Sequence, residues 1–218
     1  MAGSIYHTSG MSARTRKEEY AAATRAALIQ VARALFAERG FAEVAVDQIV
    51  QGARVTKGAL YHHFEDKLAL FRAVVETIEG EIVERVRAAA DAATRPWDKL
   101  VAACQAYLDA CMERDVQRVL VLDAPSVLGW RVWCQIDKAY VLGLFQERLA
   151  AALEAGLIEP QPLEPAALMV LGTLNVAGRL IAEASDAAAS RAQVGPTIDR
   201  LLSGLRSRTA GRASRKGR

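Results

Sequence analysis

The chain has 218 residues, 52% of them hydrophobic but only 6% aromatic, and a formal net charge of +3. This length accommodates one large core or a small module joined to a larger one. Because Ala, Leu, Glu and Arg are abundant and alternating runs of β-branched residues are absent, the composition argues against a sheet and predicts an all-α protein with about nine helices.

Charge is unevenly distributed along the chain. Residues 1–67 carry nine Lys or Arg and seven Asp or Glu, residues 68–202 carry thirteen and eighteen, and residues 203–218 carry six and none. A basic front, an acidic middle and a basic tail are typical of a nucleic-acid-binding end joined to a body that does not touch DNA.

Other classes of protein find little support. The three cysteines, Cys104, Cys111 and Cys134, form no metal-binding pattern and indicate reduced thiols. The longest apolar stretch, Pro165–Gly178, is shorter than a bilayer requires, and the N-terminus lacks the hydrophobic segment of a signal peptide. We therefore expect a cytoplasmic protein that binds no membrane, metal or cofactor.

Hydrophobic periodicity gives the predicted helices in chain order. Residues 1–16 are polar and without period, and an apolar stripe then begins at Lys17 and stops at Gly40. Asp66 can cap a long helix that ends before Arg95–Pro96. The predicted helices cover residues 17–39, 46–51, 56–64, 67–93, 97–112, 115–122, 126–155, 164–187 and 194–205.

Two of these helices are very short, and a tight turn around Gly52–Val55 joins them. This arrangement predicts a helix-turn-helix at Asp47–Phe64, whose second helix must fit a DNA major groove about 12 Å wide. Leu60 and Phe64 are four residues apart, so they anchor one face of that second helix in the core and turn its opposite face outward.

The outward residues supply the groups that DNA recognition uses. An N-cap threonine leaves backbone N–H groups free for a phosphate, and a glycine permits close approach to the duplex. A lysine, a tyrosine and a histidine offer a charge, a hydroxyl and a ring nitrogen to phosphates and base edges, and a lysine in the next helix can reach the flanking backbone. These residues are Thr56, Gly58, Lys57, Tyr61, His62 and Lys67.

Three blocks of sequence resemble the N-terminal signature of TetR-family repressors. They are ALFAERGF at Ala34–Phe41, VTKGALYHHF at Val55–Phe64 and KLALF at Lys67–Phe71. The resemblance implies a homodimer whose paired recognition helices read a palindromic operator and are released when a small molecule binds the C-terminal body. By family position, the residues that would contact DNA are Thr56, Lys57, Gly58, Tyr61, His62 and Lys67.

The chain departs from the family pattern at two positions. Ala45 stands where Ser or Thr usually caps the second helix, a loss of about 1 kcal/mol that Asp47 partly offsets through the helix dipole. Arg54 stands where the turn usually has glycine. A positive φ is strained for arginine, and the side chain could instead bring a charge towards DNA.

The region after Val75 could enclose an effector pocket between helices. Asn175 and Arg179, four residues apart in an apolar helix, are the polar groups expected to orient a largely apolar ligand. The alternative is that these side chains are ordinary core and that Asn175 bonds across a dimer. The candidate lining residues are Cys104, Tyr107, Cys111, Trp130, Trp133, Phe145, Asn175 and Arg179.

By resemblance, dimerisation is assigned to the last two helices. Their apolar residues exceed what one thin body needs, so two helices from each subunit could form a four-helix interface. These residues are Leu168, Leu171, Leu174, Ile198, Leu201, Leu202 and Leu205. The expected organisation is a flexible arm at 1–16, a DNA-binding domain at 17–66, an effector-binding and dimerisation domain at 67–206, and a basic disordered tail at 207–218.

Several alternatives stay open. Arg14, Arg16 and Lys17 could enter a minor groove or be merely solvated, and the tail Arg206–Arg218 could attract phosphates or only aid solubility. No nucleophile or phosphate-loop motif favours an enzyme, and a third ligand for a metal at His62 and His63 is missing. A transcriptional activator with the same motif, or a helical adaptor that binds protein, remains possible.

Overall fold

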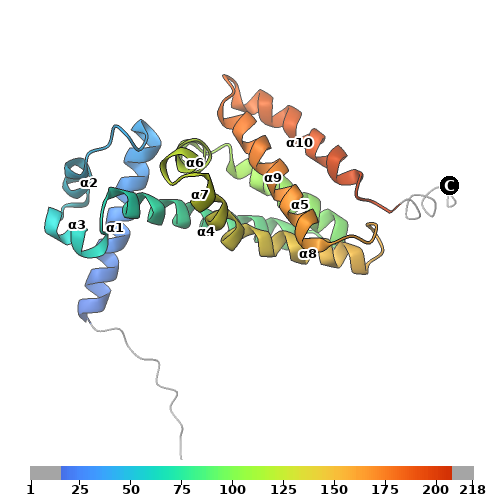
Figure 1. Ribbon diagram of the computed structural model, residues 1–218, viewed down its shortest axis with the longest axis horizontal. Helices are drawn as coiled ribbons and strands as arrows, with labels where there is room; N and C mark the ends of the chain where they lie inside the picture. The colour runs from blue at the N-terminus through green and yellow to red at the C-terminus, as the bar shows by residue number, and fades with distance from the viewer. Residues whose placement is uncertain (1–15, 208–218) are drawn as a thin grey trace, which may run out of the picture.

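The computed structural model describes residues 16–207, which form helices throughout and no β-strand beyond a single bridge between Ile158 and Arg206 (Figure 1). The elements are α1 (Arg16–Arg39), α2 (Val46–Ala53), α3 (Lys57–His63), α4 (Lys67–Ala92), α5 (Pro96–Ala110), the π-helical η1 (Val116–Asp123), α6 (Ala124–Val127), α7 (Trp130–Asp137), the π-helical η2 (Lys138–Leu142), α8 (Gly143–Glu154), α9 (Leu163–Ala182) and α10 (Ala187–Ser203). Since η1 continues into α6 and α7 continues through η2 into α8, these residues form nine continuous helical runs. The all-α prediction is confirmed.

Helices α1, α2 and α3 pack as a three-helix group with a small core. Phe36 of α1, Ile49 of α2 and Leu60 of α3 are completely buried there. The Phe71 ring of α4 stands edge-on to Phe36 and Phe41, with ring centroids 5.3 and 4.9 Å apart. The core of the three-helix group is therefore completed by the helix that follows it.

Helix α4 runs from the three-helix group into the body (Figure 1). Asp66 caps it as predicted, because its carboxylate accepts a hydrogen bond from the Ala69 N–H at 2.6 Å. Its buried residues recur every three or four positions from Leu70 to Ala90, which makes one apolar stripe along 26 residues. A single stiff helix thus serves both parts of the molecule.

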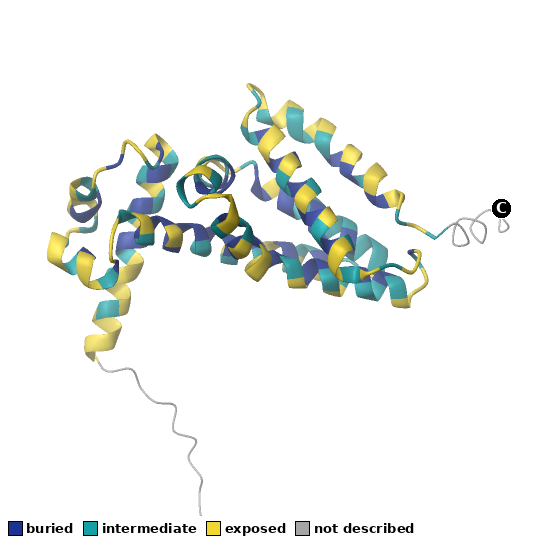
Figure 2. Cartoon of the chain, viewed as in Figure 1, coloured by how far each residue is buried: buried dark blue, intermediate teal, exposed yellow. Residues whose placement is uncertain are grey.

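The body is a helical bundle around the second half of α4. Helices α5 and α8 pack against each other, α9 lies on α8, and α10 covers α5 and α9. The η1–α6–α7 segment lies between this bundle and the three-helix group (Figure 1). Figure 2 shows the buried residues along the inward faces of these helices and the exposed residues on the outward faces.

Two helix boundaries in the body differ from the prediction. The helix expected at 126–155 is interrupted at Leu128–Gly129, where Gly129 has a φ of 80° that favours glycine, and a new helix begins at Trp130. The last two helices meet at residues 183–186 instead of between Ala187 and Val194. Asp186 sets this boundary because its carboxylate accepts from the Ala189 N–H and so caps α10.

Helix α9 is longer than the apolar stretch from which it was predicted. At 20 residues it is, by length and composition alone, long and apolar enough to cross a membrane, whereas the apolar stretch Pro165–Gly178 within it is shorter. The charged residues Glu164 and Arg179 flank that stretch within the helix. Core helices of bundles pass the same test, and α9 packs between α8 and α10 with 39% of its apolar window buried.

The predicted terminal segments lie largely outside the described residues. Of the arm at 1–16 the structure describes only Arg16, and of the tail at 207–218 only Ser207. Arg14 and the basic residues beyond Ser207 are therefore outside the described range. Arg16 and Lys17 are exposed in the first turn of α1.

The turn between α2 and α3 is built on an unusual conformation of Arg54. This residue has φ 55° and ψ 41°, in the left-handed region, at the position where the family usually has glycine. Its N–H and that of Val55 donate to Gln51 and Val50 carbonyls, which closes α2. At the other end of α2, Ala45 offers no side-chain cap, and the Gln48 amide oxygen instead accepts from the Ala45 N–H at 3.0 Å.

Arg54→Gly should therefore raise the free energy of unfolding by about 1 kcal/mol relative to Arg54→Ala, because glycine adopts the left-handed conformation without the steric cost of a Cβ. Both substitutions remove the same charge, so their difference isolates the backbone effect. Urea unfolding followed by circular dichroism measures it. Equal stabilities of the two variants would show that Arg54 is not strained.

Candidate functional site

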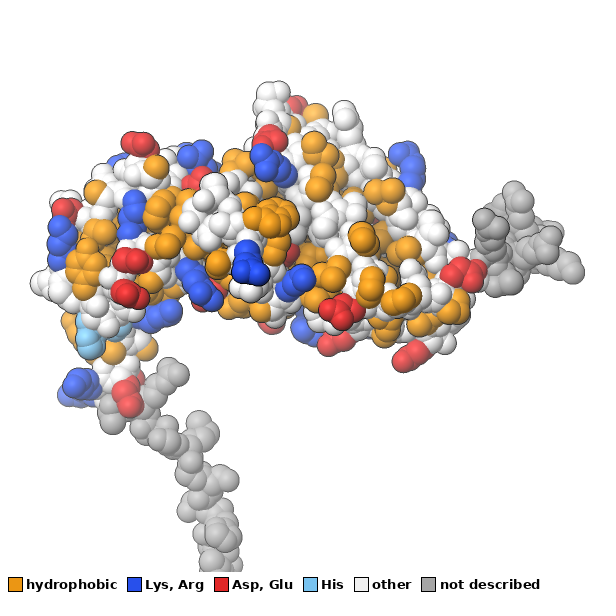
Figure 3. Space-filling model, viewed as in Figure 1, with side chains coloured by type: hydrophobic (Ala, Val, Ile, Leu, Met, Phe, Trp, Pro, Cys, Tyr) orange, Lys and Arg blue, Asp and Glu red, His pale blue; other side chains and the backbone are white. Residues whose placement is uncertain are grey.

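Helix α3 presents one face to solvent while the other is held in the core. Leu60 is completely buried and Phe64 is 5% exposed, so both predicted anchors are in place. Tyr61, on the outer face, is 51% exposed, and the histidines appear at the surface of the three-helix group in Figure 3. The predicted DNA-contacting residues that are exposed are Arg54, Thr56, Lys57, Gly58, Tyr61 and His62.

The start of α3 is organised by two polar contacts. The Thr56 hydroxyl accepts from the Ala59 N–H at 3.2 Å, so the N-cap position predicted for Thr56 is correct. The Lys57 ammonium lies 2.7 Å from an Asp47 carboxylate oxygen, and this hydrogen bond raises the pKa of Lys57. Both side chains of the pair are exposed, so the contact is weak and can be exchanged for a phosphate.

Lys67 is engaged differently from the prediction. Its ammonium donates to the backbone carbonyls of Phe41 and Val44 at 2.8 and 2.9 Å and lies 4.1 Å from the centroid of the Phe41 ring. Desolvation lowers its pKa. With two of three donors used inside the protein, Lys67 holds the loop before α2 against α4, which argues against the phosphate contact expected for it.

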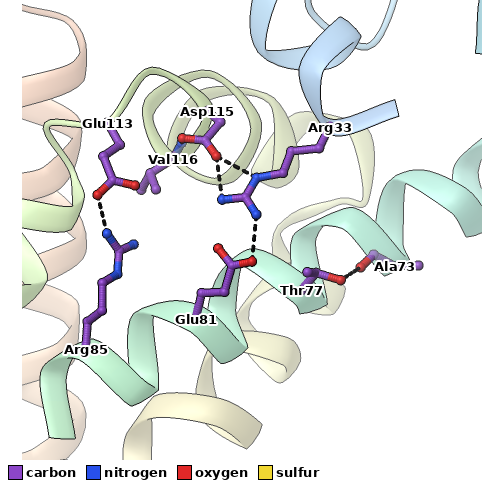
Figure 4. A network of polar contacts seen from close by, with 8 residues as sticks. All are labelled: Arg33, Ala73, Thr77, Glu81, Arg85, Glu113, Asp115 and Val116. Atoms are coloured by element: carbon purple, nitrogen blue, oxygen red, sulfur yellow. Dashed lines mark hydrogen bonds and ion pairs between the residues drawn. The ribbon is translucent and has the colours of Figure 1, made fainter. Parts of the chain in front are cut away.

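A second group of polar contacts joins α1 to the body. Figure 4 shows the Arg33 guanidinium between Glu81 of α4 and Asp115, which precedes η1. Its nitrogens lie 2.8 Å from the Glu81 carboxylate and 2.6 Å from that of Asp115. At the other end of η1, the Asp123 carboxylate accepts from the Phe41 N–H at 2.8 Å. Both ends of η1 are thus bonded to the three-helix group.

The body contains a pocket of about 440 Å³ between α5, η1, α6, α7 and α9. This volume lies in the range of small-molecule sites. Five of the predicted effector-binding residues line the pocket. They are Tyr107, Trp130, Trp133, Asn175 and Arg179.

The other three predicted lining residues are ordinary core. Cys104 and Phe145 are completely buried, and Cys111 is 1% exposed. The Cys111 sulfur packs so closely on α9 that a Cβ added at Gly178 would lie 2.8 Å from it. The helical spacing of these three residues predicts a buried face, but burial in a bundle does not distinguish a pocket wall from the core.

A chain of hydrogen bonds crosses the floor of the pocket. The Tyr107 hydroxyl donates to the Asn175 side-chain oxygen at 2.6 Å, and the Asn175 amide donates to one Asp137 oxygen at 2.8 Å. Burial keeps the pKa of Tyr107 well above its usual value, so this hydroxyl remains protonated. Asn175 therefore orients Asp137, within one chain.

Asp137 and Glu79 are functional candidates that sequence reasoning missed. Asp137 is 3% exposed and Glu79 1%, and they are the only buried charged residues in the described range. Burial raises the pKa of Asp137 to about 6, and burial together with the Asp137 charge raises the pKa of Glu79 well above its usual value. A charged residue at an inward position of each predicted helix was the signal that would have found them.

Comparison with known families decides what this arrangement belongs to. The family described as bacterial regulatory proteins, tetR family, matches residues 28–74, and the tetracyclin repressor-like C-terminal domain matches residues 97–205. The chain belongs to the TetR family. The resemblance noted in the three sequence blocks is thereby confirmed, and the helix-turn-helix of this TetR-family regulator is the segment from α2 to α3.

Individual relatives agree with this assignment. A TetR-family transcriptional regulator from Pectobacterium atrosepticum is 34% identical, with a TM-score of 0.77 over 89% of this chain and 99% of that one. The Transposon Tn10 TetC protein of Escherichia coli is 29% identical over 61% of this chain and 67% of its own length. The repressor KstR2 of Mycolicibacterium smegmatis is 32% identical over 50% of this chain, an alignment that spans about half of that relative (53%).

Two of the three thiols of this TetR-family chain, Cys104 and Cys111, are poorly suited to redox sensing. Cys104 and Cys111 are buried, and burial raises the pKa of Cys111 to about 12. A reactive cysteine needs an accessible thiolate. Within residues 16–207, no group of three His, Cys, Asp or Glu side chains is placed to hold a metal ion.

Asp137→Asn should stabilise the protein at pH 7.5 but much less at pH 4. The Asp137 pKa rises from 3.8 to about 6 on folding, so the folded state binds its proton more tightly and the free energy of unfolding falls as pH rises between these values. The gain from the variant should be larger at pH 7.5 than at pH 4 by about 2 kcal/mol. Urea unfolding at both pH values measures it.

Glu154→Gln is the matched control, since Glu154 is exposed on α8 and its substitution removes one negative charge at the surface. The groups that face Asp137 are Glu79 of α4, Tyr107 of α5 and Asn175 of α9, with Lys138 next to it in the chain. A stability gain for Asp137→Asn that is the same at both pH values would contradict the prediction.

Proposed function

We propose that the chain is a ligand-responsive repressor that binds a palindromic operator as a homodimer in the cytoplasm. The outward face of α3 carries the proposal: Lys57, Tyr61 and His62 are exposed on a helix whose inner face is locked by Leu60. In this proposal residues 17–66 bind DNA and residues 67–206 bind the effector and the second subunit. Membership of the TetR family and similarity to KstR2, which is named a repressor, support it.

Activation by the same DNA-binding domain is the second candidate, because the motif serves both kinds of regulator. A reporter gene placed behind the selected operator distinguishes them: deleting the regulator raises expression under repression and lowers it under activation. A protein-binding adaptor would show no steep dependence of DNA association on salt.

The DNA-binding proposal predicts that selection from a random duplex pool enriches an inverted repeat. With about six phosphates contacted per dimer, affinity should fall roughly a thousandfold between 50 and 200 mM salt. Tyr61→Ala should abolish enrichment, because it removes a side chain expected at base edges or phosphates. Filter binding or fluorescence anisotropy gives both results.

Tyr140→Ala is the control for that experiment, since Tyr140 is also exposed but lies in the body. It should bind the selected operator as the unaltered chain does. Enrichment that survives Tyr61→Ala would refute the proposed contact face. No enrichment at all would refute sequence-specific DNA binding.

The outer surface of α9 and α10 supports the homodimer. Large apolar side chains remain exposed there, and Figure 3 shows hydrophobic side chains over the α9 region. Two shallow grooves run along this surface. Met169 and Leu201 line part of one groove, and Val176 and Leu180 line part of the other. These exposed residues are Met169 (74%), Val176 (63%), Leu180 (56%) and Leu201 (58%).

The residues proposed for the interface differ in part from those predicted. Leu171, Leu174, Ile198 and Leu202 are buried within the chain, because the inner faces of α9 and α10 pack on the body. Leu201 alone of the predicted set is strongly exposed. A contiguous exposed apolar surface on a helical chain is typical of an interface with a second copy.

Leu180→Glu should convert the dimer into a monomer at micromolar concentration and weaken operator binding at least about tenfold, because a desolvated carboxylate opposes association. The fold should survive, since Leu180 is exposed in the single chain. Sedimentation velocity and circular dichroism measure both. Ala139→Glu, an exposed substitution on η2, is the control, and a Leu180→Glu variant that stays dimeric would contradict the interface.

The ligand response is proposed to pass through η1. Leu120 and Val121 of η1 line the body pocket, while Asp115 and Asp123 at its two ends are bonded to Arg33 and to the Phe41 backbone. A ligand that binds better when η1 is shifted must weaken the DNA-competent arrangement of α1, because coupling between two sites is reciprocal.

A further inference from the structure

The floor of the body pocket holds polar atoms that have no partner in the protein. Of the four buried side-chain polar atoms without a hydrogen bond in residues 16–207, three are Asp137 Oδ1, Glu79 Oε2 and Trp133 Nε1. Asp137 and Trp133 line the pocket and are 3% and 6% exposed. Glu79 does not line the pocket itself but lies close enough to Asp137 for the Asp137 charge to raise its pKa. Buried polar groups are normally satisfied, so the two unpartnered atoms of the pocket lining indicate groups left for a ligand.

The unpartnered atoms are chemically specific. The second Asp137 oxygen is already occupied by the Asn175 amide, which fixes the carboxyl group and leaves Oδ1 as an acceptor. The Trp133 indole N–H is a donor only. The site therefore offers a ligand a charged acceptor at Asp137 and a neutral donor at Trp133, and the charged acceptor is the stronger of the two.

The charge balance of the floor favours a positively charged donor. No Lys or Arg in residues 16–207 forms an ion pair with Asp137 or Glu79, and each carboxyl group has a raised pKa through burial. Buried carboxylates without a cation are costly, and a cationic ligand removes that cost. The pocket lining includes two cations, Lys138 and Arg179, and both are exposed. Arg179 is paired with Glu183 at 2.8 Å, and within the described residues neither cation forms an ion pair with the acidic floor.

The pocket wall suits the rest of such a ligand. The rings of Trp130 and Trp133 lie 5.0 Å apart between centroids at an angle of 44°, which forms a bent aromatic surface. Leu120, Val121 and Leu171 supply aliphatic wall. Tryptophan faces attract organic cations as well as apolar groups, so the aromatic wall and the acidic floor select the same kind of molecule.

We infer that the body pocket takes an organic ammonium ion that carries an apolar or aromatic group. The N–H groups of this ligand bind Asp137 Oδ1, with the Glu79 carboxyl group of α4 nearby. Its apolar or aromatic group lies against Trp130 and Trp133. This inference rests on the proposed ligand response and specifies the chemical class of the ligand. Neutral alcohols and carboxylates of the same shape are the competing classes.

Isothermal titration calorimetry of the full chain at pH 7.5 tests the class with matched probes. One set is tryptamine, tryptophol and indole-3-propionate, and the other is 2-phenylethylamine, 2-phenylethanol and 3-phenylpropanoate. Within each set the body is constant and the end group is ammonium, hydroxyl or carboxylate. The ammonium compound should bind at least about tenfold more tightly than the alcohol, and the carboxylate most weakly.

Asp137→Asn keeps the size of the side chain and its contact with Asn175 but removes the charge. It should reduce tryptamine affinity by about tenfold or more and leave tryptophol affinity within about twofold. Glu154→Gln, an exposed substitution on α8, should change neither. Circular dichroism of each variant verifies that the helical fold is retained.

Three results overturn the inference. The first is a higher affinity for the alcohol or the carboxylate than for the ammonium compound of the same set. The others are no binding of either ammonium compound below about 1 mM, and an unchanged tryptamine affinity in Asp137→Asn. Operator binding by the same preparation is measured in parallel without any probe. If operator binding is present and the ammonium preference is absent, the ligand class is wrong and the proposed regulator stands. If operator binding is absent, the proposed function itself fails.

Discussion

The edge-on packing of Phe71 against Phe36 and Phe41 is the contact on which the two parts of this protein depend. It places a residue of α4 in the core of the three-helix group, so a helix that is otherwise the axis of the body holds α1, on which α2 and α3 pack. Lys67 strengthens the same junction, because its ammonium ties the loop after α1 to the first turn of α4. The three-helix group that carries α3 therefore cannot turn relative to α4 without disturbing a buried aromatic cluster.

The three-helix group could be predicted well from the sequence because its apolar spacing and helix caps depend on residues close together in the chain. The apolar spacing of α1, the anchors Leu60 and Phe64 and the cap at Thr56 each follow from neighbours within four residues. Lys67 escaped prediction because its partners are carbonyls more than twenty residues away. The family motif predicts that Lys67 contacts DNA, whereas the fold directs its side chain towards the carbonyls of Phe41 and Val44.

The body was predicted less completely, and for a physical reason. Helix faces can be inferred from periodicity, but which buried face borders a cavity depends on how several helices meet. Tyr107 and Cys104 are both on buried faces of α5, yet only Tyr107 reaches the pocket. The acid pair was missed because Glu79 and Asp137 are far apart in the chain, and each alone resembles an ordinary charged helix residue.

The position of that acid pair joins the two halves of the molecule. Glu79 lies eight residues beyond Phe71 on α4, a separation of about 12 Å along a continuous helix. Asp137 is the last residue of α7 and directly precedes the π-helical segment η2, and η1 forms another wall of the same pocket. Single-turn π segments occur often at functional sites, because the widened turn adjusts at low cost. In the proposed ligand response, a charge that enters this pocket acts through Asp137 on Glu79 of α4, the helix that also completes the core of the three-helix group, and on the segment whose ends hold Arg33 and the Phe41 backbone. Both routes from the pocket end at α1 and α4, which is where the proposed ligand response would change the spacing of the two recognition helices in the proposed homodimer.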